Sequence, residues 1–95
     1  KFAVRAISEG LRMDLLGTGI RVSNIEPGMA ETEFSVVRLG SQEKANQVYA
    51  GMRPLTAKDI AETIFWVVQR PDHVNIQEVV IYPTDQAHVG MVHRS

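Results

Sequence analysis

The sequence predicts an α/β fold in which two parallel strands are joined by a helical crossover. Apolar residues recur at helical spacing near residues 3–15 and 57–68, as in amphipathic helices. Two short apolar segments, residues 20–25 and 78–82, have the character of strands. The long helical stretch between them favours a right-handed βαβ unit. Because two strands alone make a poor sheet, we expect further strands upstream of this chain.

The composition is that of one globular domain and excludes several classes of function. Ninety-five residues form one domain at most. Ten Lys and Arg residues against eleven Asp and Glu residues give a net charge of −1, so we expect neither a nucleic-acid partner nor an anionic membrane surface. The absence of cysteine excludes disulfides, thiolate nucleophiles and cysteine–metal sites. The longest apolar run, residues 64–68, is too short to span a bilayer, and without a signal-peptide pattern we expect a cytoplasmic protein.

The first helix is already under way at the first residues, where no capping residue precedes it. This start predicts a fragment of a longer chain. Ala3, Ile7, Leu11 and Leu15 form one apolar stripe, and small residues beside it would let another helix approach closely. The helix is expected to stop at residues 17–19, Gly-Thr-Gly. Because this motif follows a helix and does not precede one, a helix cap is favoured over a phosphate-binding loop.

The first strand, residues 20–25, is expected to end at the turn Pro27-Gly28. Two short helices are predicted after it, at residues 33–39 with Thr32 as the N-cap and at residues 41–52. The last dozen residues of the chain show no clear period.

The clearest helix follows Thr56, which is expected to form a capping box with Asp59. Its apolar stripe consists of Ala57, Ile60, Ala61, Ile64, Phe65 and Val68. Residues 70–71, Arg-Pro, should end this helix, because a residue before proline is disfavoured in helical conformation. Residues 78–82 then read as a central, buried strand.

Most polar motifs favour ordinary structural roles. His73, His88 and His93 lack the spacing of metal ligands, so no metal is expected. Asp59 and Glu62 are more typical of a solvated helix face than of an acid–base pair.

The segment from Glu26 to Thr32 is different, because it follows a strand at the edge where open α/β sheets bind ligands. A Pro-Gly turn there would expose backbone groups, and the Thr32 hydroxyl could help them to hold a planar amide. On chemistry alone both a ligand site and an ordinary turn stay open, with the turn favoured.

Three segments resemble the short-chain dehydrogenases/reductases in the right order and spacing. Residues 1–15 (KFAVRAISEGLRMDL) are similar to the helix that follows the Tyr-x-x-x-Lys motif of this family. Residues 21–32 (RVSNIEPGMAET) resemble its strand and Pro-Gly-x-x-x-Thr loop, and residues 54–64 (PLTAKDIAETI) its penultimate helix. Residues 24–35 and 81–87 are most similar to the subfamily of NADP-dependent 3-hydroxy acid (serine/allo-threonine) dehydrogenases.

The resemblance implies that residues 1–95 are the C-terminal segment of a Rossmann-type domain with a doubly wound parallel sheet, without its N-terminal nucleotide-binding half. The parent would be a homotetrameric oxidoreductase that transfers a hydride between NADP, or NAD, and a small 3-hydroxy acid or β-hydroxy amino acid. The segment alone would be inactive, because the family's tyrosine, serine and glycine-rich turn would lie upstream. The alternatives are a non-catalytic α/β interaction module and a relative that binds nucleotide without turnover.

The resemblance also implies the site residues. Lys1 matches the motif lysine, which bonds the nicotinamide ribose and lowers the pKa of the catalytic tyrosine. Thr32 would meet the nicotinamide carboxamide. The whole loop expected to bind the cofactor comprises Pro27, Gly28, Met29, Ala30, Glu31, Thr32, Glu33, Phe34 and Ser35.

Overall fold

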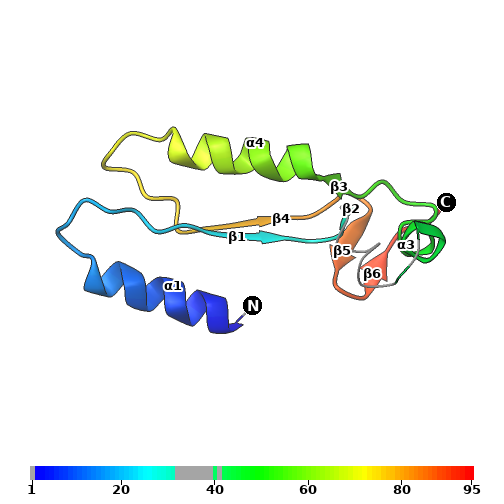
Figure 1. Ribbon diagram of the computed structural model, residues 1–95, viewed down its shortest axis with the longest axis horizontal. Helices are drawn as coiled ribbons and strands as arrows, with labels where there is room; N and C mark the ends of the chain where they lie inside the picture. The colour runs from blue at the N-terminus through cyan, green and yellow to red at the C-terminus, as the bar shows by residue number, and fades with distance from the viewer. Residues whose placement is uncertain (1, 32–39, 41) are drawn as a thin grey trace.

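The computed structural model describes residues 2–31, 40 and 42–95, and the helix predicted at residues 33–39 lies outside them. The order of helices and strands follows the prediction and adds short strands to it (Figure 1). The elements are α1 (Phe2–Asp14), β1 (Asn24–Pro27), β2 (Ala30–Glu31), α3 (Gln42–Val48), β3 (Leu55–Thr56), α4 (Ala57–Val68), β4 (Glu78–Ile81), β5 (Gln86–His88) and β6 (Met91–Val92).

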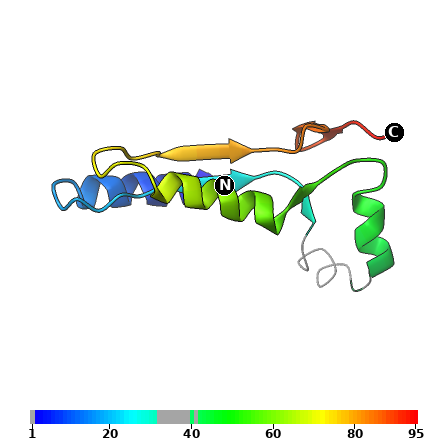
Figure 2. The ribbon, with the colours of Figure 1, turned by 90° about the horizontal axis from the view of Figure 1, so that it is seen from above.

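A parallel pair of strands, β1 and β4, forms the centre of the fold, with Ile25 opposite Val79 and Pro27 opposite Ile81. Helix α4 covers one face of the pair and α1 the other, as Figure 1 shows. In the view of Figure 2, α3 and the C-terminal hairpin both lie beyond the carboxyl ends of the two strands, on opposite sides. This arrangement confirms the predicted α/β class with parallel strands. Among the described residues, each of the two strands pairs with the other alone, so one edge of each stays open.

Helix α1 ends at Asp14, shortly before the predicted stop at residues 17–19, and the two glycines lie in the turn that follows. Gly17 and Gly19 have φ angles of 89° and 80°, a left-handed conformation that glycine adopts without strain. The buried residue of α1 is Ser8, whereas Ile7 of the apolar stripe is 63% exposed. The stripe therefore faces away from this chain's own strands.

Strand β1 begins at Asn24, later than the predicted residue 20. The reason is that the preceding backbone is bonded to side chains instead of to a strand. Arg12 Nη1 and Asn75 Nδ2 each donate to the Val22 carbonyl at 3.2 Å. Ladder bonding starts only where the Asn24 N–H donates to the Gln77 carbonyl at 2.9 Å.

Helix α4 begins and ends as predicted. The Thr56 hydroxyl accepts from the Asp59 N–H at 3.2 Å, and the Asp59 carboxylate accepts from the Thr56 N–H at 2.9 Å, which completes the capping box. The helix stops at Val68, before the Arg-Pro pair. Its buried residue is Val67, and most of the predicted apolar stripe is exposed, including Phe65 at 62%.

Two pairings in the second half of the chain were not predicted. Strands β2 and β3 form a parallel pair with Ala30 opposite Leu55. The last residues, which show no clear period in the sequence, form an antiparallel hairpin of β5 and β6. Distant partners hold this hairpin; Arg94, for example, donates to the Val48 and Ala50 carbonyls at 2.9 and 2.6 Å. Helix α3 ends at Val48, short of the predicted residue 52.

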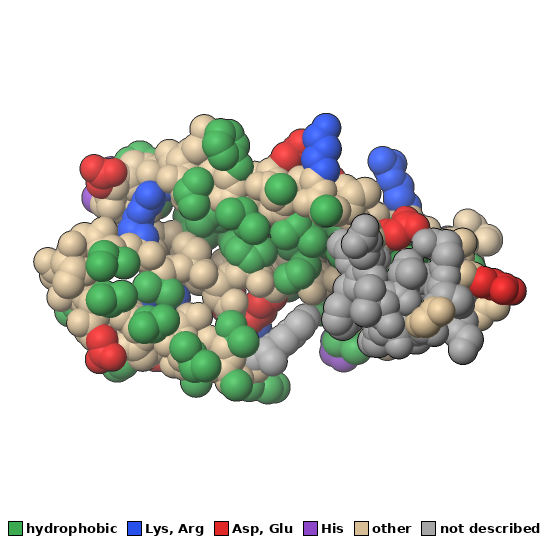
Figure 3. Space-filling model, in the orientation of Figure 1, with side chains coloured by type: hydrophobic (Ala, Val, Ile, Leu, Met, Phe, Trp, Pro, Cys, Tyr) green, Lys and Arg blue, Asp and Glu red, His purple; other side chains and the backbone are tan. Residues whose placement is uncertain are grey.

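The chain buries little of its apolar surface. Among the described residues, the buried apolar side chains are Tyr49, Leu55, Val67 and Pro83. The accessible surface is 7000 Å², against about 5,500 Å² for a compact monomer of this length. The radius of gyration is 16.1 Å, against about 12 Å for a compact domain. Figure 3 shows apolar side chains gathered on the surface over α4 and α1. The predicted burial of β4 is wrong within this chain, since Val80 is 57% exposed.

Candidate functional site

The turn after β1 lies where the two parallel strands end. Pro27 is the last residue of β1, and the next N–H, that of Gly28, donates to the Ile81 carbonyl of β4 at 2.8 Å. The chain therefore leaves the sheet at its carboxyl edge, the side on which open α/β sheets bind ligands.

Gly28 sits where no side chain would fit. A Cβ atom at this position would lie 2.6 Å from Gln86 Oε1 and 2.9 Å from Tyr82 Cδ1, both shorter than real Cβ contacts. Glycine is required here by close approach, because β5 and the residue after β4 pack directly against the turn.

The turn is bonded along its backbone to three other parts of the chain. The Met29 N–H donates to Gln86 Oε1 at 2.8 Å, and the Met29 carbonyl accepts from the Leu55 N–H at 2.9 Å. The Tyr49 hydroxyl donates to the Ala30 carbonyl at 2.7 Å. The expectation that the turn exposes its N–H groups is therefore wrong for Gly28 and Met29. These two amides fix the shape of the turn and are not open to a ligand.

A charged cluster holds the strand that leads into this turn. Glu26, directly before Pro27, is 5% exposed and accepts from Arg5 Nε at 2.8 Å and from Arg5 Nη2 at 2.9 Å. Arg5 Nε also lies 2.6 Å from a carboxylate oxygen of Glu78, and Asn24 Nδ2 donates to Glu26 at 3.0 Å. Thus one guanidinium group on α1 ties the helix to both β1 and β4.

The hydrogen bonds from Arg5 lower the pKa of Glu26 to about 2, against the opposing effect of burial. The same carboxylate raises the pKa of Arg5 above its usual range. Both groups are charged at neutral pH, so a bidentate ion pair connects the start of α1 to the end of β1.

The structure brings only part of the predicted site together. Residues 27–31 form the turn and β2. Lys1, Thr32, Glu33, Phe34 and Ser35 lie outside the described residues. Lys1 directly precedes Phe2, the first residue of α1, and Arg5 follows four residues later in the sequence.

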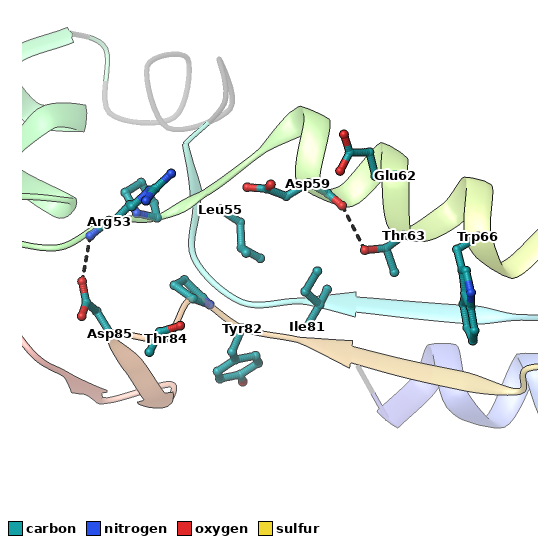
Figure 4. A pocket seen from close by; sticks show the side chains of 12 residues that line it. Arg53, Leu55, Asp59, Glu62, Thr63, Trp66, Ile81, Tyr82, Thr84 and Asp85 are labelled. Carbon is teal, nitrogen blue, oxygen red and sulfur yellow. Dashed lines mark hydrogen bonds between the residues drawn. The ribbon is translucent and has the colours of Figure 1, made fainter.

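An open groove of about 770 Å³ runs between α4 and the carboxyl end of β4 (Figure 4). Among its lining residues, the Arg53 N–H donates to the Asp85 carboxylate at 2.9 Å, and hydrogen bonds from Thr56 lower the pKa of Asp59. Asp59 is thus held by its capping box, which favours the structural role expected for it. Residues 27–31 do not line this groove, so it is separate from the turn.

Sequence reasoning missed Gln86, Tyr49 and Arg5, which hold the candidate site in shape. Gln86 and Tyr49 carry no local signal, because their partners lie far away in the sequence. A signal for Arg5 did exist. Glu26 is a carboxylate directly after a predicted strand, and a buried carboxylate needs a cationic partner.

Over residues 2–31, 40 and 42–95, no cluster of three or more potential metal ligands occurs. Within the same part of the chain, the helices are too short or too polar to cross a membrane.

The sequence is closely related to enzymes, although no protein-family profile matches it. Serine 3-dehydrogenase of Agrobacterium fabrum is 50% identical over 91 residues, which are 95% of this chain and 36% of that protein. The NADP-dependent 3-hydroxy acid dehydrogenase YdfG of Salmonella typhi is 48% identical over 98 residues, covering 100% of this chain and 40% of that protein. A solved structure, the closed form of serine dehydrogenase complexed with NADP+, matches 100% of this chain and 40% of its own with a TM-score of 0.87 and 43% identity.

The fold and these relatives confirm the resemblance: the chain is homologous to dehydrogenases of the short-chain, Rossmann-type class. Within that class, its relatives are serine 3-dehydrogenases and NADP-dependent 3-hydroxy acid dehydrogenases. The chain spans between 36% and 40% of the length of these relatives.

Proposed function

We propose that this chain is the C-terminal segment of a short-chain dehydrogenase that transfers a hydride between NADP and a small 3-hydroxy acid or β-hydroxy amino acid. The observation that carries the proposal is the match over the whole chain to a serine dehydrogenase complexed with NADP+. The exposed apolar faces of α1 and α4 also favour a larger parent, because they are surfaces that a complete domain would cover.

In this proposal the chain supplies one wall of the cofactor site. Residues 27–35 would enclose the nicotinamide end, with Thr32 bonding the carboxamide and Lys1 bonding the ribose. The described part of this loop suits such a role, because it leaves the carboxyl edge of the sheet in one fixed shape. NADP supplies the hydride chemistry when bound, and the Lys1 ammonium would lower the pKa of a tyrosine upstream so that it can exchange the substrate proton.

The proposal also covers the oligomeric state, the location and the partners of the enzyme. We propose a homotetramer in the cytoplasm, with small-molecule ligands and with neither nucleic acid nor membrane as partner. Taken alone, residues 1–95 would not turn over substrate, since the tyrosine, the serine and the pyrophosphate-binding turn belong to the upstream part.

The test is an assay of the purified full-length protein. NADPH formation is followed with serine, allo-threonine and 3-hydroxy acids of three or four carbons, and 2-hydroxy acids serve as controls. We expect turnover of the 3-hydroxy compounds, and faster turnover with NADP than with NAD. NADPH binding without turnover of any of these compounds would favour the nucleotide-binding alternative, and the absence of binding would favour an interaction module.

A further inference from the structure

The C-terminal hairpin is joined to the cofactor turn by a buried glutamine. Gln86 opens β5, is 7% exposed, and accepts the Met29 N–H through Oε1 at 2.8 Å. The same oxygen occupies the space next to Gly28 that a side chain would otherwise fill. The Gln86 amide group therefore closes over two consecutive residues of the turn.

The hairpin itself is anchored at its far end. The His93 N–H donates to the Asp85 carbonyl at 2.7 Å and closes the hairpin. Beyond it, the Ser95 N–H donates to the Gly51 carbonyl at 2.9 Å, and the Arg94 guanidinium binds two carbonyls at the end of α3. Gln86 is thus presented to the turn from a hairpin that is itself attached to the chain after α3 through Arg94 and Ser95.

We propose that residues 86–95 act as a strut for the cofactor turn and that Gln86 is a positioning residue for NADP binding. The inference rests on the proposed function, because it describes what supports the turn that would bind the cofactor. A half-buried N–H needs an acceptor, and without Gln86 Oε1 the Met29 amide would seek one elsewhere. The turn would then spend part of its time in other conformations, and cofactor affinity would fall by the fraction of molecules that are competent to bind.

The test uses full-length protein with Gln86→Met, which keeps the approximate shape and removes the amide group. If the competent fraction falls to between about a third and a tenth, the Kd of NADPH rises about 3- to 10-fold. We expect this rise for Gln86→Met, with a kcat at saturating NADP within about twofold of wild type. A Gln86→Met Kd within twofold of wild type overturns the proposal.

A matched control and a second measurement separate this inference from the proposed function. Val89→Thr changes the hairpin at a site that is 71% exposed and should leave the Kd unchanged; an equal rise there overturns a specific role for Gln86. Amide hydrogen exchange reports the bond directly. We expect the Met29 amide to exchange slowly in wild type and faster in Gln86→Met, and equal rates overturn the proposal. If the wild type binds no NADPH, the proposed function fails, and the exchange rates still decide whether Gln86 holds the turn.

Discussion

Gly28 leaves little room for a side chain, because Gln86 and Tyr82 lie close to its Cα hydrogens. We predict that Gly28→Ala destabilises the protein by about 1–3 kcal/mol, because the added methyl group meets Tyr82 and displaces Gln86 from the Met29 amide. Urea unfolding of the full-length protein measures the change. Gly90→Ala is the matched control: it lies in an exposed turn and its Cβ meets nothing within 4 Å, so stability should change by less than about 0.5 kcal/mol. Equal effects of the two substitutions would contradict the steric explanation.

Glu26 gives the protein a sensitivity to acid. Its pKa is about 2 in the folded protein, below the ordinary value of about 4.3 that an unfolded chain retains. Its contribution to stability is therefore complete above about pH 5 and is lost as the pH falls toward 2. We predict that Glu26→Gln is destabilised at pH 7 and that its stability changes less than that of wild type between pH 5 and pH 2.5. Urea midpoints across this range measure it, with Glu9→Gln as the control that should keep the wild-type slope.

Whether a feature of the candidate site could be predicted depends on how close in the sequence the residues that produce it are. Pro27 and Gly28 could be predicted from sequence, because a Pro-Gly pair after a strand marks a turn in any context. The bonding of the Met29 amide could not, since its partner Gln86 lies 57 residues further along the chain. For that reason the expected open amides proved to be bonded.

At the scale of the element, the capping box of α4 provides a direct test. We predict that Thr56→Ala costs about 1 kcal/mol, because the Asp59 N–H loses its acceptor. Thr56→Ser keeps the hydroxyl and should lie within a few tenths of a kcal/mol of wild type. Thermal unfolding of both variants measures the difference, and equal losses would show that the hydroxyl is not what stabilises the helix start.

The two ends of α4 differ in how far they could be predicted. The N-cap uses residues three positions apart, so the sequence alone reveals it. At the other end, the Arg21 guanidinium binds the carbonyls of Val68 at 3.1 Å and Arg70 at 2.9 Å, next to the negative end of the helix dipole. Arg21 precedes them by more than forty residues, and only the folded arrangement of β1 beside α4 brings them together.

At the scale of the whole molecule, the exposed stripe of α1 bears on assembly. Ile7 and Leu11 are 63% and 45% exposed, and Ala6 beside them is exposed as well. We predict that Ala6→Arg shifts the full-length protein toward smaller species in sedimentation velocity, because a charged side chain would be buried between subunits. Asp72→Arg, a similar change in an exposed loop, should leave the distribution unchanged. An unaltered distribution in Ala6→Arg would exclude α1 from the interface of the proposed tetramer.

The order of elements followed from periodicity, but their burial did not. A stripe of apolar residues shows which side of a helix avoids water, and it does not say whether this chain or another segment covers that side. Phe65 and Val80 fit the patterns of a core, yet both are more than half exposed here. The apolar pattern within these residues does not show which surface would cover these two side chains.

The open edges of β1 and β4 affect how long the polypeptide would survive in a cell without aggregation or degradation. An unpaired strand edge is a template on which other extended chains can add, and β4 offers the apolar run Val79, Val80 and Ile81 beside such an edge. If proteolysis released residues 1–95 from the proposed full-length protein, this open edge would be accessible to chaperones and proteases. Degradation or aggregation would then set the lifetime of the released segment. Its steady-state amount would depend on the capacity of the cell's chaperones and proteases.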